Sequence, residues 1–303
     1  MLNRALNATI RSFLLGFYKL KFTLGARLAP HHTAISGAAL FSTPTRPSRN
    51  KLVAPADMPA ARLREVVLPS GTVTLYEWGD PTVQPTVLLM HGWNGWALQF
   101  AAFIRPLLEQ GFAIVALDFT GHGRSAGRRA SLPGFIDTTL ALLEDLPNLT
   151  GIVGHSLGAA AAACTLAQSR NPALKLVLIA PPNSPRVFLE KFAAMLGMPL
   201  KLVDAMQRWM EQHYGRSFAS ISVNRVAPQI PAHTLIIHDP ADKIVPFEHG
   251  ESYARLLSHA QLAPLEGWGH SRILQSPDAI RLTVDFVAAR ELRRIPQSVS
   301  PAW

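Results

Sequence analysis

The feature that most constrains the fold of this chain is the pentapeptide G-H-S-L-G at residues 154–158. The strand-like run Thr150–Val153 precedes it, and an Ala-rich stretch typical of a helix, residues 159–163, follows it. When a strand turns directly into a helix at a serine, the serine adopts a strained backbone conformation that exposes its hydroxyl. The flanking glycines leave room where a Cβ would clash. The pattern therefore predicts that Ser156 is a nucleophile.

A serine hydroxyl is a weak nucleophile until a base takes its proton. The candidate base is His270, in a loop at residues 267–271 that follows the last expected strand. An acid must orient the imidazole and stabilise its cation. Asp242 is the candidate acid, just past the expected strand Thr234–His238, and Asp239, three residues earlier, is its rival.

Short apolar runs alternate with helical patterns along most of the chain, and the first two runs flank a Ser-Gly turn typical of a β-hairpin. The expected strands are Val66–Leu68, Thr72–Trp78, Thr86–Met90, Ala113–Leu117, Ile152–Gly154, Leu174–Ile179, Thr234–His238 and Gln261–Leu265. The expected helices between and after them cover residues 98–110, 132–145, 157–169 and 276–293. This alternation predicts the α/β class, with a mostly parallel sheet covered by helices on both faces.

Residues 182–231 interrupt the alternation with two helical stretches of their own, and we expect a small helical cap there. A length of 303 residues suits one α/β domain with such an insertion. We therefore expect an α/β core at 61–181 and 232–293. A basic amphipathic extension and linker at 1–60 precede the core, and a tail at 294–303 follows it.

Several motifs occur in the order that is found in the α/β-hydrolase superfamily, which the chain resembles over about residues 62–290. H-G-W at 91–93 resembles the family's oxyanion loop, and residues 118–125 resemble its D-x-x-G-x-G-x-S loop. The resemblance implies a serine esterase or lipase-like enzyme with a Ser156–Asp242–His270 triad in the family's chain order. It favours Asp242 over Asp239, because the family's acid directly precedes an x-x-Val-Pro sequence, which here ends at Pro246.

The resemblance also assigns the oxyanion hole to the backbone N–H groups of Trp93 and Leu157. The chain lacks the triple-Gly oxyanion loop of some lipases and esterases. The expected function is cleavage of a carboxylic ester, or a related acyl bond, through an acyl-enzyme on Ser156. The same fold also supports aminopeptidase, thioesterase, lactonase or cofactor-free haloperoxidase chemistry. A non-catalytic, membrane-docked binding protein is the alternative that an intact triad disfavours.

The expected partner is a small-molecule ester or acyl substrate. Apolar side chains on the motif loops and in the cap are candidates to line its pocket: Trp96, Trp268, Phe188, Phe192 and Met206. Packing in the core is an equal alternative for Trp96. The candidate metal ligands in the sequence cluster only around His238. Because a hydrolytic metal site normally needs three ligands with an open position, and no second cluster is present, we expect no metal. We expect no cofactor, because the glycines at 121–123 lack the third glycine of a dinucleotide fingerprint.

The N-terminal extension carries nearly all of the formal net charge of +9. Residues 1–56 hold eight Lys or Arg and no Asp or Glu, so the remainder of the chain is near neutral. Because the charge lies outside the expected core, we expect no nucleic-acid binding. A single cysteine, Cys164, excludes an intramolecular disulfide and is compatible with a reducing compartment. We expect a cytoplasmic location, with membrane association as an alternative.

Apolar residues recur at helical spacing through the first part of this extension: Leu2, Leu6, Ile10, Phe13, Phe17, Leu20 and Leu24. Basic residues interrupt them, so the segment is not a transmembrane span. Three interpretations stay open. Residues 1–30 make a peripheral contact with a membrane, they act as a targeting segment, or they pack on the folded domain.

Overall fold

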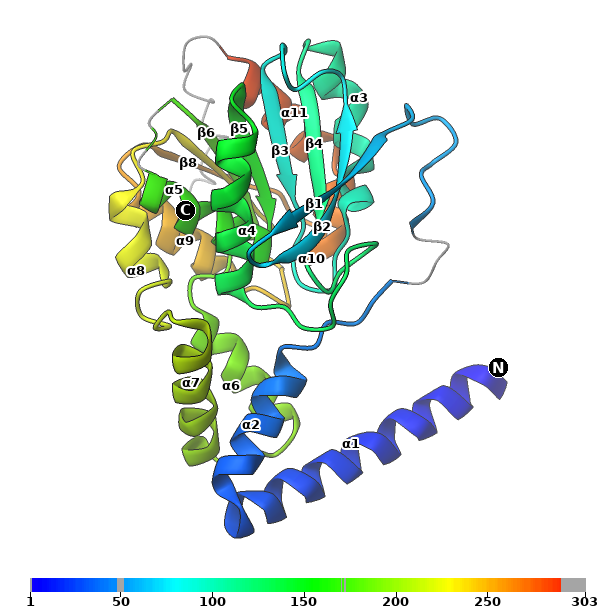
Figure 1. The fold of residues 1–303 in the computed structure, drawn as a ribbon, viewed down its shortest axis with the longest axis vertical. Coiled ribbons are helices and arrows are strands. Elements are labelled where there is room, and N and C mark those ends of the chain that lie inside the picture. The colour runs from blue at the N-terminus through cyan, green and yellow to red at the C-terminus, as the bar shows by residue number, and fades with distance from the viewer. Residues whose placement is uncertain (1, 48–51, 170, 172, 290–303) are drawn as a thin grey trace, which may run out of the picture. The chain divides into compact units, whose positions relative to one another are not determined.

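A computed structural model describes residues 2–47, 52–169, 171 and 173–289. It contains an eight-stranded sheet in the order β1-β2-β4-β3-β5-β6-β7-β8 (Figure 1). The strands are β1 (Arg62–Leu68), β2 (Gly71–Trp78), β3 (Thr86–Met90), β4 (Ala113–Asp118), β5 (Leu149–His155), β6 (Lys175–Ile179), β7 (Thr234–His238) and β8 (Ala260–Pro264). The pairs β1–β2 and β2–β4 are antiparallel, and the pairs from β4 through β3 to β8 are parallel.

The central strands are apolar on both faces because helices cover both. Every residue of β3, β4 and β7 is buried. The main helices of this part are α3 (Ala101–Glu109), α4 (Leu132–Asp145), α5 (Leu157–Ser169), α9 (Phe247–Leu256) and α11 (Pro277–Ala288). In Figure 1, α4 and α5 lie in front of the sheet and α3 and α11 behind it, and the members of each pair touch. The predicted α/β class with a mostly parallel, two-sided sheet is confirmed.

Short helical segments complete the path between these elements. They are the 3-10 turns η2 (Ala97–Phe100), η3 (Ala227–Gln229) and η4 (Ile273–Gln275) and the one-turn helices α8 (Val223–Val226) and α10 (Gly269–Arg272). The last of these, α10, directly follows the turn after β8 and carries His270. The expected tail, 294–303, lies outside the described residues.

The chain divides into two compact units. Residues 45–183 and 223–303 form the unit with the sheet, here called the sheet unit. Residues 1–44 and 184–222 form the other, here called the helical unit. Its helices are α1 (Leu2–Leu28), α2 (Pro30–Phe41), α6 (Pro185–Met195) and α7 (Leu200–Tyr214). The N-terminal segment and the inserted helices are thus parts of one unit, although they are far apart in the sequence.

One apolar core joins the four helices of the helical unit. Its buried members are Phe22, Ala34, Ala38, Leu189, Ala193, Leu196, Met198, Leu202, Val203, Met206, Met210 and Phe218. Helix α2 lies close against α7 at Gly37, which has no side chain. A Cβ at this position would stand 2.8 Å from the sulfur of Met206. The Tyr214 hydroxyl lies 3.2 Å from Ser42 Oγ at the end of α2. Among the described helices of the whole chain, none is both long and apolar enough to cross a membrane.

Candidate active site

Three side chains that lie far apart in the sequence form one hydrogen-bonded chain in the sheet unit. His270 Nε2 lies 3.0 Å from Ser156 Oγ, and His270 Nδ1 lies 2.7 Å from Asp242 Oδ2. Both distances are within hydrogen-bond range. A carboxylate only accepts, so Nδ1 carries the ring proton and donates a hydrogen bond to Asp242, which leaves Nε2 free to accept the Ser156 proton. The structure brings together the three residues predicted as nucleophile, base and acid.

The sheet positions these side chains at one edge. Ser156 follows β5, Asp242 follows β7 and His270 follows β8, and these strands are parallel members of the same sheet. The carboxyl ends of parallel strands share one edge, which is where open α/β sheets place their ligand sites. The loops that leave this edge therefore lie close together, and each carries one of the three hydrogen-bonded residues.

Ser156 stands on a strained turn between β5 and α5. Its φ of +52° lies in the left-handed region, which costs a non-glycine residue about 1–3 kcal/mol. Two backbone hydrogen bonds hold it there: the Ser156 N–H donates to Ile179 O at 2.9 Å, and the Ala160 N–H donates to Ser156 O at 3.1 Å. A Cβ on Gly158 would lie 2.3 Å from Met90 O, so only glycine fits where α5 begins against β3.

Asp242 is buried and fully engaged. Its Oδ1 accepts the backbone N–H groups of Ile244 at 2.8 Å and Val245 at 3.0 Å, while Oδ2 faces His270. Burial alone would raise the pKa of this carboxyl, but His238, His270 and the Ile244 N–H outweigh burial and hold the pKa below its ordinary value. Asp242 is therefore ionised at neutral pH, as the partner of an imidazole that gains a proton must be.

Asp239, the rival acid, binds backbone N–H groups of the neighbouring loops and not the imidazole ring. Its Oδ2 accepts the backbone N–H of Trp268 at 2.6 Å and that of Gly269, and its Oδ1 accepts the N–H of Ala241 at 2.7 Å. These bonds join the loop after β7 to the loop that carries His270. Asp242 is thus the carboxylate that holds the imidazole ring, and Asp239 fixes the backbone just before it.

His155 supports the same loop from the pentapeptide. Its Nε2 lies 2.8 Å from the carbonyl oxygen of His270, which can only accept, so Nε2 carries the proton. Burial lowers the pKa of His155 to about 3. A neutral, buried imidazole that donates to the backbone of the candidate base is a positioning group and not a second base.

The loop at 91–94 lies against the turn that carries Ser156. A Cβ on Gly92 would stand 2.7 Å from Ser156 Cβ and 3.3 Å from the Leu157 nitrogen. The segments that contain the predicted oxyanion donors, Trp93 and Leu157, are therefore in backbone contact. Their role as donors stays a prediction.

Two buried histidines hold the 91–94 loop in place. His91 Nδ1 donates to Gly92 O at 2.7 Å and its Nε2 accepts the Phe119 N–H at 3.1 Å. His122 Nε2 accepts the Asn94 N–H at 3.2 Å. Burial lowers the pKa of His91 to about 4 and that of His122 to about 3, so both are neutral acceptors at neutral pH.

Asp118 is a residue of the site whose role no sequence pattern indicated. It ends β4 and is completely buried. Its carboxylate accepts the backbone N–H groups of Ala97 and Arg124, each at 2.7 Å. It therefore connects the loop after β3 to the loop at 118–125. Its place at the carboxyl end of a central strand, like that of Ser156, is the signal that could have identified it.

The predicted pocket residues fall in both units. Trp96 and Trp268 are partly buried against the main core of the sheet unit. Phe188, Phe192 and Met206 belong to the helical unit, where Met206 is completely buried and Phe192 packs on the core. A pocket-lining role for these five residues stays a prediction.

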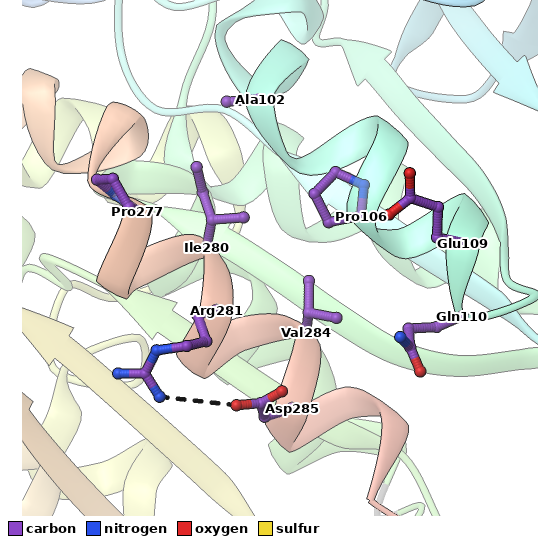
Figure 2. Close-up of a pocket in the computed structure, with 9 residues that line it drawn as sticks. All are labelled: Ala102, Pro106, Glu109, Gln110, Pro277, Ile280, Arg281, Val284 and Asp285. Atoms are coloured by element: carbon purple, nitrogen blue, oxygen red, sulfur yellow. Dashed lines mark ion pairs between the residues drawn. The ribbon is translucent and has the colours of Figure 1, made fainter.

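A groove of about 430 Å³ lies between α3 and α11, and Figure 2 shows an ion pair between Arg281 and Asp285 at its edge. Its lining is Ala102, Pro106, Glu109, Gln110, Pro277, Ile280, Arg281, Val284 and Asp285, and it includes no member of the hydrogen-bonded chain. Within the described part of the chain, no group of three or more His, Cys, Asp or Glu side chains is placed to hold a metal ion.

Comparisons with known proteins identify a family for this chain. The model of the alpha/beta hydrolase family matches residues 87–281. A human serine hydrolase-like protein is 34% identical over 99 residues, which are 31% of this chain and 48% of that protein. The bifunctional esterase/perhydrolase DCH of Acinetobacter calcoaceticus is 25% identical over 266 residues, 70% of this chain and 93% of that protein.

Among solved structures, a bacterial membrane phospholipase A is similar with a TM-score of 0.57 and 19% identity, over 91% of this chain and 98% of that one. Residues 45–303 make up less than 91% of the chain, so the match includes part of residues 1–44. At this identity the likeness concerns the fold alone. The family match spans more than half of the chain and contains Ser156, Asp242 and His270, and the protein therefore belongs to the α/β hydrolase family.

Proposed function

We propose that the protein is a serine hydrolase that cleaves carboxylic esters through an acyl-enzyme on Ser156. The observation that carries this proposal is the hydrogen-bonded chain from Ser156 through His270 to the ionised Asp242. Ser156 itself stands on the strained turn between β5 and α5. Such a chain activates a hydroxyl for attack on a carbonyl group.

In the first half-reaction, Ser156 Oγ attacks the carbonyl carbon of the ester while its proton passes to His270 Nε2. The negative charge that develops on the carbonyl oxygen is stabilised by the N–H groups of Trp93 and Leu157. The tetrahedral intermediate collapses, and the C–O bond to the alcohol breaks. His270 gives its proton to the leaving alcohol, and the acyl group stays on Ser156.

In the second half-reaction, His270 takes a proton from water as the water oxygen attacks the acyl carbon. The bond to Ser156 Oγ then breaks, Ser156 regains its proton, and the carboxylic acid leaves. Throughout both steps, Asp242 remains a carboxylate and stabilises the imidazolium. The esterase and serine hydrolase-like names of the relatives support this choice of chemistry.

The direct test is covalent labelling followed by turnover of a series of p-nitrophenyl esters. A fluorophosphonate probe should label the wild type and not Ser156→Ala, which should also lose at least about 1,000-fold in kcat. Ser220→Ala, at an exposed serine of the helical unit, is the control and should label normally. Labelling that survives in Ser156→Ala would remove Ser156 as the nucleophile.

A second activity is favoured by one relative. The bifunctional esterase/perhydrolase covers 70% of this chain, and perhydrolysis needs only that hydrogen peroxide replace water in the second half-reaction. The acyl-enzyme would then yield a peroxycarboxylic acid and free Ser156. In acetate buffer with hydrogen peroxide and bromide, acetic acid would acylate Ser156 with loss of water, and peroxide would release peracetic acid, which oxidises bromide to the species that brominates monochlorodimedone. This bromination should be seen with the wild type and lost in Ser156→Ala. Its absence in an active esterase would limit the function to hydrolysis.

A further inference from the structure

Helix α1 has one face that packs and one that does not. On the packed face, Phe22 is completely buried in the core of the helical unit, and Leu15, Tyr18 and Ala26 are partly buried against that core. These contacts account for only one side of the helix.

The opposite face of α1 carries an exposed apolar stripe, made of Phe17, Leu20, Leu24 and Leu28, each between 47% and 83% exposed. At 100° per residue, these four positions fall within an arc of about 80°, on the side away from Phe22. A single exposed leucine is ordinary, but a continuous row of large apolar side chains marks a surface that contacts something.

The charges beside the stripe are all positive. Lys21 and Arg27 are exposed and fall on either side of it by the same helical spacing. The helical unit as a whole contains ten Lys or Arg and three Asp or Glu. Two of those three acids, Glu190 and Asp204, form ion pairs with Arg186 of α6. The helical unit that carries the stripe therefore has a net positive charge.

We propose that α1 lies flat on an anionic phospholipid membrane, with the apolar stripe inserted at the boundary between headgroups and acyl chains. Helices that bind in the plane of a membrane combine an apolar face with flanking Lys and Arg, whose stems cover apolar surface while their charged ends reach the phosphates. A second copy of the chain would bring the same cations against each other without compensating acids, because residues 1–56 contain none.

Flotation of the full-length protein with vesicles tests this proposal. Binding is expected to vesicles of phosphatidylcholine and phosphatidylglycerol at three to one, and to weaken at 0.5 M salt and on pure phosphatidylcholine. The double variant Leu20→Gln/Leu24→Gln should bind at least about 100-fold more weakly, since each of the two apolar side chains withdrawn from water contributes about tenfold or more in affinity. Lys21→Gln/Arg27→Gln should also lose about 30-fold, and only on anionic vesicles.

The matched control is Val67→Gln/Val83→Gln, which makes the same kind of change at two exposed apolar residues of the sheet unit. It should bind like the wild type, and circular dichroism should show one melting temperature for all the variants. The proposal is overturned if the wild type does not float with anionic vesicles, or if the control pair weakens binding as much as the stripe pair. It is also overturned if the stripe pair only dissociates a dimer in sedimentation and leaves vesicle binding unchanged.

Discussion

The buried carboxylates of Asp239 and Asp242, three residues apart, have different roles because they bind different partners. Asp242 accepts the ring N–H of His270, whereas Asp239 accepts main-chain N–H groups from Trp268 and Gly269. The first contact orients the imidazole and stabilises its charge, and the second fixes the backbone on which the imidazole stands. Loss of each carboxylate should therefore affect different measurements.

Asp242→Asn should lower kcat by about 1,000-fold or more, because an amide in its place can turn its NH₂ toward His270 and stabilise the wrong tautomer. Asp239→Asn should lower kcat by only about tenfold but lower the melting temperature more, since one amide oxygen cannot accept all three N–H groups. Kinetics with p-nitrophenyl acetate and thermal melting of both variants give the comparison. If Asp239→Asn has the larger kcat defect, the roles assigned to the two acids are reversed.

At this scale, the sequence pattern indicated the nucleophile and the base, whereas Asp242 was preferred over Asp239 as the acid only through the family resemblance. The pentapeptide identifies Ser156 because its strand, turn and helix are local. The choice between Asp239 and Asp242 depends on contacts with residues 268–270, about thirty positions later, and spacing carries no such information. The link made by Asp118 between two loops is equally non-local.

At the scale of helices and strands, the sheet was predicted well because its buried strands are continuous apolar runs, such as β3 and β7. Helices α2 and α9 were not among the predicted elements. The buried residues of α2 are small, such as Ala34 and Gly37, and those of α9 include His249, so neither helix shows a wide apolar stripe. The shared core of α2 and α7 joins segments about 170 residues apart, which no local pattern indicates.

Helix α1 offers a matched pair of substitutions that separates its two faces. Phe22→Ala should cost the helical unit about 3–5 kcal/mol, because it empties a fully packed site, whereas Phe17→Ala should leave the free energy of unfolding nearly unchanged. Limited trypsin digestion should show faster cleavage near Lys21 and Arg27 in Phe22→Ala alone. Equal protection in the two variants would contradict the packing of α1 on the helical unit.

At the scale of the whole molecule, the histidines that build the site also set how stability depends on pH. His91, His122 and His155 are buried, and burial lowers their pKa values to about 4, about 3 and about 3. In the unfolded chain each should return to about 6.5. Below that pH, the unfolded state binds up to three more protons than the folded state. The free energy of unfolding therefore rises with pH in this range.

The free energy of unfolding should therefore be nearly constant above pH 7 and fall as the pH drops from about 6.5 towards 4, by up to about 4 kcal/mol per pH unit once all three histidines are protonated in the unfolded chain. Urea unfolding at pH 8, 7, 6 and 5 measures this slope. His122→Gln keeps an acceptor for the Asn94 N–H but cannot take up a proton, so it should reduce the slope between pH 6 and 5 by about a third. An unchanged slope in this variant would mean that His122 is already protonated in the folded protein, which its role as an acceptor for the 91–94 loop does not allow.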